Sequence, residues 1–300
     1  MCYAFIMNEY CVALCAINSK YIHSALAPWY LAASLDACGA DNIRTQVVEG
    51  TINESAATVL QRILAVKPQA VCIGCYIWNI TLVKELLPLL KAADSGLPII
   101  LGGPEVSYNA AQILKENPQV DYIISGEGEQ PLALLIKDLS AGRRGRGEGV
   151  CYRRKDGTLN ISPPYIAANE PPDPYTQKYF AALNGRIAYF EASRGCPFSC
   201  AFCLSGRCGS VRRFDFSLCC ERLLRLANSG TKTIKFVDRT FNADLKCAKA
   251  YWRFILNSYG KEIPAGVCFH FEIAGDLLDD EAINLLAQGR LSAGNRYAEL

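Results

Sequence analysis

The sequence predicts an α/β protein in which a flavodoxin-like (Rossmann-like) parallel sheet is followed by a partial (β/α) barrel. Apolar runs of strand length alternate with amphipathic segments of helix length from residue 11 to residue 139, and this alternation resumes at residue 187. Between the two stretches, five of the 14 prolines fall between Pro163 and Pro174, which is typical of an extended linker. The chain has 300 residues, enough for two units that each bury a core.

Five strand–helix pairs are expected in the first half of the chain. The strands are predicted at residues 11–17, 45–48, 70–74, 99–101 and 122–125, and the helices at residues 24–38, 54–66, 81–93, 108–117 and 130–139. Ser24 is the predicted cap of the first helix, and Gly39 follows its end. Because most of the strands are continuous apolar runs, we expect a parallel sheet covered by helices on both faces.

The loops after these strands form the predicted binding rim. Parallel sheets of this kind bind ligands at the carboxyl ends of their strands, beside the point where the strand order reverses. In a flavodoxin-like order, residues 18–23 and 75–79 flank that point, and the glycine-containing segments 102–105 and 126–129 complete the rim. Glycines there allow the backbone to approach a large flat ligand closely. Each glycine taken alone is equally well explained by a turn.

A hairpin and a linker are expected between the two units. Residues 143–147 are basic and rich in glycine, which is typical of an exposed turn. The segment 155–157 (Lys-Asp-Gly) lies between two short strand-like stretches and predicts a hairpin. We therefore expect a first domain at residues 1–142, a hairpin and proline-rich linker at 143–185, and a second domain at 186–300.

Three further strand–helix pairs follow in the second half. Strands are predicted at residues 187–190, 233–237 and 267–273, and helices at residues 218–228, 243–259 and from 279 onward. Ser217 is the predicted cap of the first of these helices. This repetition predicts an open (β/α) barrel with its site at the carboxyl ends of the strands.

The composition indicates a soluble globular protein and argues against nucleic-acid-binding and membrane-spanning functions. Hydrophobic residues make up 51% of the chain and charged residues 20%, as in an ordinary soluble globular protein, and the net charge of +2 gives no reason to expect a nucleic-acid partner. Residues 1–17 contain Glu9 and lack a basic start, so neither a signal peptide nor a membrane span is expected. Most of the 15 cysteines lie in apolar runs, as buried thiols of a reducing compartment would, and a cytoplasmic location is expected.

Three cysteines stand apart from the others, on a loop punctuated by glycine and proline. Cys196, Cys200 and Cys203 have the spacing Cys-x3-Cys-x2-Cys and follow a predicted strand directly. Three thiolates so placed can hold three corners of an iron–sulfur cube, and cubanes used only for electron transfer normally take four cysteines. Three ligands leave one iron open to substrate, as in a catalytic metal site. A structural zinc or four-cysteine cluster with Cys208 as fourth ligand, and a chance spacing, are the alternatives.

This triplet, with Phe202 before its third cysteine, resembles the signature of the radical S-adenosylmethionine (SAM) enzymes. The resemblance implies that Cys196, Cys200 and Cys203 hold a 4Fe–4S cluster and that the methionine part of SAM chelates the fourth iron. One electron from the cluster then cleaves SAM to methionine and a 5′-deoxyadenosyl radical. An electron donor such as a flavodoxin or ferredoxin is implied as well.

The resemblance also implies SAM-binding residues. Phe202 belongs to the motif, and Asp238 and Glu272 stand near the ends of the second and third predicted strands, where the family places acidic or polar residues that bind the SAM ammonium or ribose. For Asp238 the alternative is an N-terminal cap of the next helix. For Glu272 it is a salt-bridged glutamate of the barrel.

The first half resembles the cobalamin-binding domain of one large radical SAM class. The matching stretches are residues 18–23, 101–107 and 124–129. The resemblance implies a cobalamin site formed by Ser19, Lys20, His23, Cys75, Tyr76, Gly102, Gly103, Pro104, Ser125, Gly126 and Glu127.

One motif of cobalamin domains is missing. Domains that supply a histidine to cobalt carry Asp-x-His-x-x-Gly after the first strand, whereas Tyr21 and Leu26 occupy the corresponding positions around His23. A histidine ligand to cobalt is therefore not implied, and a capping or surface role explains His23 equally well.

The implied activity is that of a cobalamin-dependent radical SAM enzyme acting on an unknown, small-molecule or other substrate. In this class the radical abstracts hydrogen from an unreactive carbon, and methylcobalamin can deliver a methyl group. Barrels of the class contain more strand–helix pairs than the three found here, and residues 288–300 show no further strand pattern. We therefore expect a barrel that is cut short. The alternatives are an inactive cofactor-binding relic and a metal- or cluster-binding regulatory module.

Overall fold

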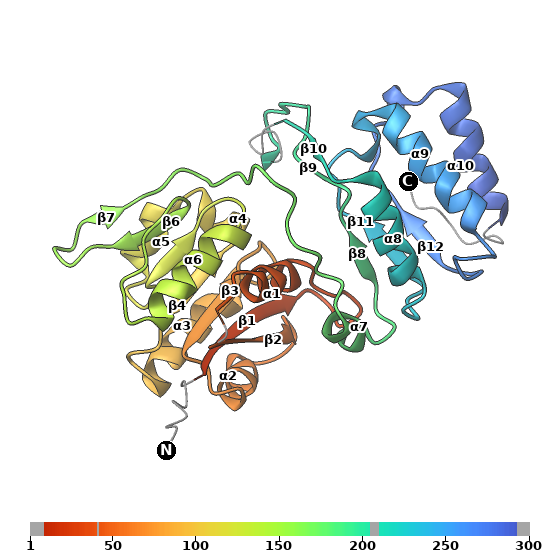
Figure 1. Cartoon of the computed structure of the whole chain (residues 1–300). Helices are drawn as coiled ribbons and strands as arrows, with labels where there is room; N and C mark the ends of the chain where they lie inside the picture. Colours follow the sequence, from red (N-terminus) through yellow and green to blue (C-terminus); the bar gives the residue numbers. More distant parts are fainter. Residues whose placement is uncertain (1–8, 41, 205–209, 293–300) are drawn as a thin grey trace, which may run out of the picture. The chain divides into compact units, whose positions relative to one another are not determined.

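The computed structural model describes residues 9–40, 42–204 and 210–292, which form two compact units (Figure 1). Unit 1 runs to Tyr21 and resumes from Ala25 to Pro174. Unit 2 contains Ile22–Ser24 and the described residues from Tyr175 onward. Both units contain parallel strands and helices, so the predicted α/β class is confirmed.

The sheet of unit 1 has the strand order β2-β1-β3-β4-β5-β6-β7. Its first five members pair in parallel, and the order reverses between β1 and β3, as the flavodoxin-like prediction requires. The strands are β1 (Tyr10–Asn18), β2 (Ile43–Thr51), β3 (Ala70–Gly74), β4 (Ile99–Gly102), β5 (Tyr122–Ile124), β6 (Val150–Arg153) and β7 (Leu159–Asn160).

Helices cover both faces of this sheet, and each face has its own apolar core. Successive side chains of a strand point to opposite faces. Accordingly, Ala13 and Cys15 of β1 belong to one core, and Val12 and Leu14 belong to the other. The first core contains residues of α2 (Ala56–Ala65), α3 (Ile80–Ala93) and α5 (Ala110–Glu116), and the second contains residues of α1 (Ala27–Ala37) and α6 (Glu129–Ser140).

Two helix predictions in unit 1 were wrong in detail. Helix α1 begins at Ala27 after Leu26, and Ser24 is not its cap, because the Ser24 hydroxyl donates to the Ile187 carbonyl at 2.7 Å. The helix predicted at 108–117 is preceded by a separate short helix, α4 (Pro104–Ser107), which starts at the proline directly after β4. A proline at the first helical position favours such a start.

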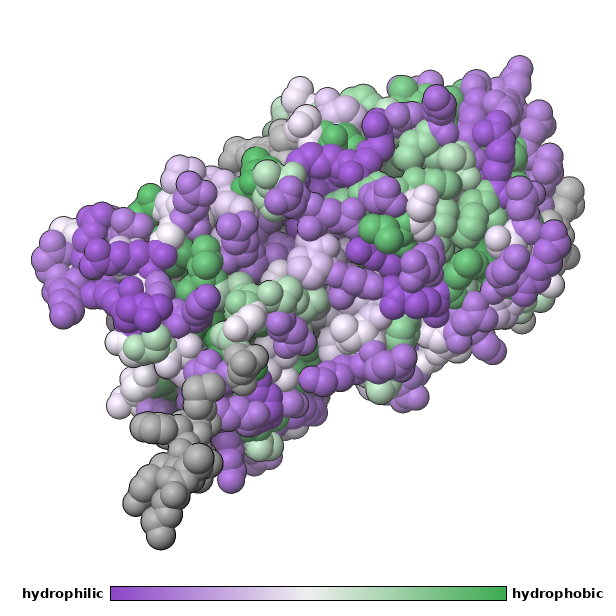
Figure 2. Space-filling model, viewed as in Figure 1, coloured by the Kyte–Doolittle hydropathy of each residue, from purple (hydrophilic) through white to green (hydrophobic). Residues whose placement is uncertain are grey.

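The predicted hairpin is present as β6 and β7, and it belongs to the sheet. Strand β6 pairs antiparallel with β5, and β7 pairs with β6, so backbone groups of β5 are hydrogen-bonded on this side. The compact unit accordingly reaches Pro174, beyond the domain end expected at residue 142. The exposed hairpin tip, Arg154–Gly157, belongs to the hydrophilic region at the left of Figure 2.

Unit 2 contains the three-stranded parallel sheet β12-β11-β8. The partial barrel predicted from the sequence is therefore confirmed within the described residues. The strands are β8 (Ala188–Phe190), β11 (Thr233–Phe236) and β12 (Cys268–His270), and the helices are α7 (Gln177–Leu183), α8 (Phe216–Ala227), α9 (Leu245–Ser258) and α10 (Asp280–Ser292).

Aromatic side chains form the centre of unit 2. The Phe236 ring meets Phe190 and Phe241 with ring centroids 4.9 Å apart in each pair. Helix α8 begins two residues earlier than predicted, because Asp215 rather than Ser217 caps it by accepting the Leu218 N–H at 2.9 Å. Helix α7 was not predicted.

A short segment from the loop after β1 belongs to unit 2. His23 forms a parallel bridge with Ile187, just before β8, and the Ile187 N–H donates to the Ile22 carbonyl at 2.9 Å. Residues 22–24 thus pair along the free edge of β8. No helix among the described residues is both long and apolar enough to cross a membrane.

Candidate functional site

The three-cysteine loop starts at the carboxyl end of β8 and is closed at its base. Strand β9 (Ser193–Arg194) pairs antiparallel with β10 (Arg212–Arg213), which joins the two ends of the loop. Gly195 between β9 and the first cysteine has φ +101°, a conformation that favours glycine. The sequence predicted the loop but not this strand pair, because each strand is only two residues long.

The three cysteines differ in their exposure. Cys196 is half-buried, Cys200 and Cys203 are exposed, and none of the three is in a disulfide. The Cys203 N–H donates to the Cys200 carbonyl at 3.0 Å, which makes a turn between the last two thiols, and the Phe202 side chain in that turn is 92% exposed. Cys208, the alternative fourth ligand, lies outside the described residues.

The donor set fits an iron–sulfur cluster in chemistry and position. Three thiols stand on one short loop, and two of them are at the surface where their side chains can turn. In the described parts of the chain, however, no three Cys, His, Asp or Glu side chains are gathered closely enough to hold a metal ion.

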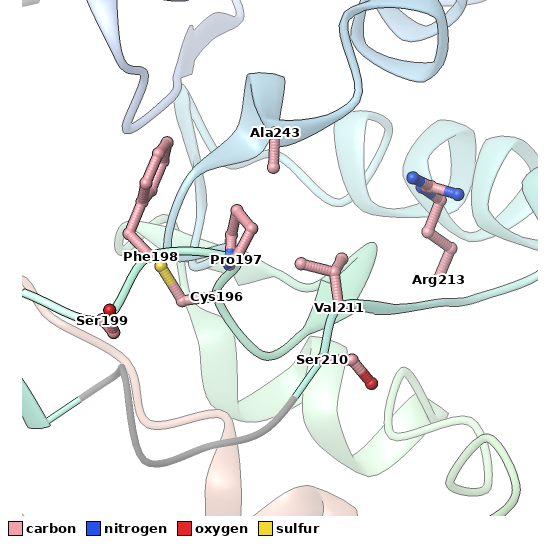
Figure 3. Close-up of a pocket in the computed structure, with 8 residues that line it drawn as sticks. All are labelled: Cys196, Pro197, Phe198, Ser199, Ser210, Val211, Arg213 and Ala243. Atoms are coloured by element: carbon pink, nitrogen blue, oxygen red, sulfur yellow. The ribbon is translucent and has the colours of Figure 1, made fainter.

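A cavity of about 420 Å³ lies beside the first cysteine (Figure 3). This volume is within the range of small-molecule sites. Ala243 points toward the loop that carries Cys196, and Arg213 of β10 contributes a guanidinium. The lining residues are Cys196, Pro197, Phe198, Ser199, Ser210, Val211, Arg213 and Ala243.

Asp238 follows β11 and is buried, with 2% of its surface exposed. One carboxyl oxygen accepts the Ala192 N–H at 3.1 Å, and the other accepts the Ser193 hydroxyl. Burial raises the pKa of the Asp238 carboxyl to about 7, although these two hydrogen bonds lower it. The alternative that Asp238 caps the next helix is excluded, since Asp244 caps α9 by accepting the Cys247 N–H.

Thr240 contacts the cysteine loop, whereas the Glu272 side chain is exposed. The Thr240 hydroxyl lies 3.6 Å from the Cys196 sulfur, a contact that the sequence analysis missed. The only available signal was that Thr240 follows a predicted strand end. Glu272 follows β12 and its side chain is exposed, while its main-chain carbonyl accepts the Phe241 N–H at 2.8 Å.

In unit 1, a buried asparagine joins the ends of the two strands that flank the reversal point. The Asn79 side-chain amide donates to the Ile17 carbonyl at 3.1 Å and to the Gly74 carbonyl at 2.9 Å. Its oxygen accepts the Tyr76 N–H at 2.8 Å. The sequence placed Asn79 in the rim loop but did not assign it a role, because its partners are main-chain atoms of distant residues.

An exposed apolar surface lies next to this asparagine. The Tyr76 and Trp78 rings are stacked, with centroids 4.5 Å apart and planes 5° apart. Ile77 between them is 74% exposed and Trp78 is 46% exposed. An aromatic pair beside an exposed isoleucine, at the carboxyl edge of a parallel sheet, can contact a flat and partly apolar ligand.

Most of the predicted cobalamin-binding residues follow strands at the same edge of the sheet. They are Ser19 and Lys20 after β1, Tyr76 after β3, Gly102, Gly103 and Pro104 at the end of β4, and Ser125, Gly126 and Glu127 after β5. Two of the predicted cobalamin-binding residues are placed differently from this group. Cys75 is fully buried in the core, where burial raises its pKa to about 12. His23 belongs to unit 2, and its Nδ1 lies 2.7 Å from the Tyr189 hydroxyl.

The glycines of the rim are explained by different features of their surroundings. Gly103 has φ +101°, and a Cβ there would lie 2.5 Å from the Cys75 carbonyl oxygen. Gly126 has φ +87°, and a Cβ there would strike the Tyr165 backbone. Both are therefore required by the packing of the chain itself. At Gly102 a Cβ would lie 3.9 Å from Ile124, an ordinary contact, so this position can accept a side chain.

Comparison with known proteins assigns a family to the first unit and finds relatives that extend beyond it. Residues 13–136 match the B12 binding domain family. The chain is 31% identical over 194 residues to the anaerobic magnesium-protoporphyrin IX monomethyl ester cyclase of Rubrivivax gelatinosus, an alignment that covers 58% of this chain and 33% of the cyclase. It is 25% identical over 211 residues to the cobalamin-dependent radical SAM methyltransferase TokK of Streptomyces tokunonensis, covering 62% of this chain and 30% of TokK.

Solved structures share the fold over nearly the whole chain. The cobalamin-dependent SAM radical enzyme OxsB superposes with a TM-score of 0.74 at 17% identity, covering 95% of this chain and 43% of OxsB. The radical SAM methyltransferase TsrM of Kitasatospora setae gives a TM-score of 0.70 at 18% identity, covering 93% of this chain and 57% of TsrM. The chain spans about a third of the length of the curated relatives cited above.

A flavodoxin-like unit that matches the B12 binding domain, joined to parallel strands that lead into a three-cysteine loop, defines one class of protein. The class is the radical SAM proteins with an N-terminal cobalamin-binding domain. The resemblance to this class found in the sequence is confirmed by the match to the B12 binding domain and by the similarity to its members.

Proposed function

We propose that this chain binds cobalamin on unit 1 and a 4Fe–4S cluster with SAM on unit 2, as part of a cobalamin-dependent radical SAM enzyme, with methyl transfer as its reaction. The observation that supports this most is the three-cysteine loop at the carboxyl end of β8, in a chain whose residues 13–136 match the B12 binding domain. TokK is a methyltransferase and the R. gelatinosus relative is a cyclase, so relatives of both reaction types exist.

In unit 2, Cys196, Cys200 and Cys203 would hold the cluster. The bound cluster supplies the electron for reductive cleavage of SAM. The cavity of about 420 Å³ beside Cys196 offers room for a small molecule, and Arg213, which is paired with Asp244 at 2.7 Å, lies at one side of it. Phe202 is exposed and free to close over a ligand, and Glu272 is an exposed carboxylate near the end of β12.

In unit 1, the carboxyl ends of β1, β3, β4 and β5 would hold the corrinoid. The stacked Tyr76 and Trp78 rings offer apolar contact, and Gly102 leaves the backbone open on a strand end. Bound methylcobalamin supplies a methyl group. Ser19, Lys20 and Glu127 offer polar atoms along the same edge for amide side chains of such a ligand.

A second candidate is cofactor binding without turnover. It is favoured by the family match, which covers residues 13–136 of unit 1 and is a match to a binding domain. We expect a small-molecule substrate and a small electron carrier such as a flavodoxin or ferredoxin for the active form, in the cytoplasm.

The test is formation of 5′-deoxyadenosine by the whole chain, reconstituted anaerobically with iron and sulfide and supplied with SAM and a strong reductant. The proposal expects product that depends on iron and disappears in Cys203→Ala. A loaded cluster without 5′-deoxyadenosine would favour binding without turnover. Zinc in place of iron in the purified chain would favour the regulatory-module alternative.

A further inference from the structure

The segment that follows β11 contacts the cysteine loop at two places. The Val237 N–H donates to the Phe190 carbonyl at 2.8 Å, which continues the parallel pairing up to the end of β8. Asp238 then accepts hydrogen bonds from Ala192 and Ser193, the residues that lead from β8 into the loop. Two residues later, the Thr240 hydroxyl reaches to 3.6 Å from the Cys196 sulfur.

The other restraints on the base of the loop involve residues nearer the surface. Glu191 and Arg194 form an ion pair at 3.0 Å, and the Arg194 guanidinium lies 5.9 Å from the centre of the Phe214 ring. The β9–β10 pair closes the base with backbone contacts. Asp238 differs from these because it is buried and joins the loop to a different strand of the sheet.

The surroundings of Asp238 leave little room for a ligand. Only 2% of the residue is exposed, and each carboxyl oxygen already has a partner within the chain. The cavity that borders Asp238, Thr240 and Cys247 has a volume of about 20 Å³. That volume is about the size of one water molecule and far smaller than the amino-acid or ribose part of SAM.

We propose that Asp238 is a positioning residue for the iron–sulfur cluster, which fixes the base of the cysteine loop through Ala192 and Ser193 while Thr240 orients the first thiol. This inference rests on the proposed function, and it gives Asp238 a role other than the SAM contact expected from the sequence. A buried carboxyl is costly unless it is hydrogen-bonded, so its retention at this place is explained by the two bonds that it accepts from the loop.

The first experiment uses the cofactor-free chain. The rate at which iodoacetamide alkylates Cys196 is measured by peptide mass spectrometry in the wild type, Asp238→Ala, Asp238→Asn and Ser193→Ala. We expect Asp238→Ala to raise this rate by about fivefold or more, because losing buried hydrogen bonds frees the base of the loop. Asp238→Asn keeps one acceptor and a similar shape, so it should restore most of the protection. Arg239→Ala, an exposed neighbour, is the matched control.

The second experiment measures iron and sulfide retained after anaerobic reconstitution and desalting, together with SAM affinity of the loaded fraction. Iron retention should fall by about fivefold in Asp238→Ala, recover in Asp238→Asn and stay normal in Arg239→Ala. SAM affinity per loaded cluster should not change. If circular dichroism shows that Asp238→Ala does not fold, Ser193→Ala serves as the test variant. It should show the same changes with a smaller magnitude.

Two results would overturn the inference. One is normal alkylation and iron retention in Asp238→Ala with weakened SAM binding, which would make Asp238 a SAM contact. The other is wild-type behaviour of Ser193→Ala and Asp238→Ala in both experiments. If the wild-type chain takes up no iron at all, the proposed function fails, yet the alkylation experiment still tests the positioning role.

Discussion

In unit 1 the candidate corrinoid site lies on backbone that the sheet itself fixes, whereas in unit 2 the contacts that join the candidate cluster loop to the sheet, among the described residues, lie at its base. Asn79 joins the ends of β1 and β3, and Gly103 packs against the Cys75 backbone. The cysteine loop has its β9–β10 closure and the Asp238 contacts, beyond which Cys200 and Cys203 are exposed. The candidate corrinoid site is therefore built on main chain that the sheet holds, and the candidate cluster site carries two of its three thiols on exposed residues.

The largest effect is expected from removing a thiol. Replacing Cys196, Cys200 or Cys203 with alanine should abolish most iron loading, because two thiolates do not hold a cubane securely. Corrinoid uptake by unit 1 should not change. Iron and sulfide analysis after anaerobic reconstitution measures the first effect, and a hydroxocobalamin titration measures the second.

Cys208→Ala is the control for these three variants, and it should load iron normally. Loss of iron in Cys208→Ala together with retention in Cys196→Ala would contradict the three-cysteine assignment and favour a different ligand set.

A pair of glycine variants tests whether the rim of unit 1 is formed in advance. Gly103→Val should lower both thermal stability and corrinoid uptake, because its side chain would strike the Cys75 backbone at a positive φ. Gly102→Val has room in the fold and should leave the melting temperature nearly unchanged while weakening corrinoid binding by about tenfold. Circular dichroism melts and absorbance titrations separate the two effects. Equal corrinoid affinity in Gly102→Val and wild type would place the ligand elsewhere.

A pH effect on the stability of unit 2 is expected from Asp238. The Asp238 carboxyl ionises at its ordinary pKa of 3.8 when unfolded and at about 7 when folded, because burial disfavours the charged form. Between these values the folded state binds more protons. The free energy of unfolding of unit 2 should therefore fall as pH rises from about 4 to about 7 and then level off.

Asp238→Asn should remove this decline, since an amide does not titrate. Glu191 and Asp244 are the nearby carboxylates, and each forms an ion pair, with Arg194 and Arg213 respectively. Denaturant unfolding at several pH values provides the measurement, followed by the fluorescence of Trp252 in a background in which Trp29 and Trp78 are replaced with phenylalanine. An equal decline in Asp238→Asn would assign the pH dependence to other groups.

The smallest effect is expected at His23. His23→Phe removes a hydrogen bond to Tyr189 and should destabilise unit 2 by about 1 kcal/mol. Corrinoid affinity and the visible spectrum of the bound corrinoid should stay as in the wild type, because the His23 Nδ1 is already engaged with the Tyr189 hydroxyl. A changed cobalt spectrum in this variant would restore His23 as a cobalamin residue.

Local patterns were enough to predict the strands of the two parallel sheets and the cysteine loop. Strands such as Ala70–Gly74 are continuous apolar runs ended by glycine, and their burial on both faces makes the pattern clear. The spacing of the three cysteines is visible without any fold. These features depend on neighbours in the sequence, so the sequence alone contains them.

Features that depend on distant partners could not be predicted. Ser24 precedes a helix and has a good capping side chain, yet it bonds to Ile187 in unit 2. The partners of Asp238 lie more than forty residues earlier in the chain. Gly103 was expected to let a ligand approach the backbone closely, whereas in the structure the Cys75 backbone occupies the space beside it.

The central claim is that one chain holds two cofactors on two sites of different construction. The direct measurement is the content of corrinoid, iron and sulfide in a single anaerobically reconstituted sample of the whole chain, for the wild type, Gly102→Val and Cys200→Ala. The account predicts one corrinoid and about four irons per wild-type chain, loss of corrinoid alone in Gly102→Val, and loss of iron alone in Cys200→Ala. A wild-type chain that binds corrinoid but no iron under these conditions, or loss of both cofactors in either variant while it stays folded, would contradict it.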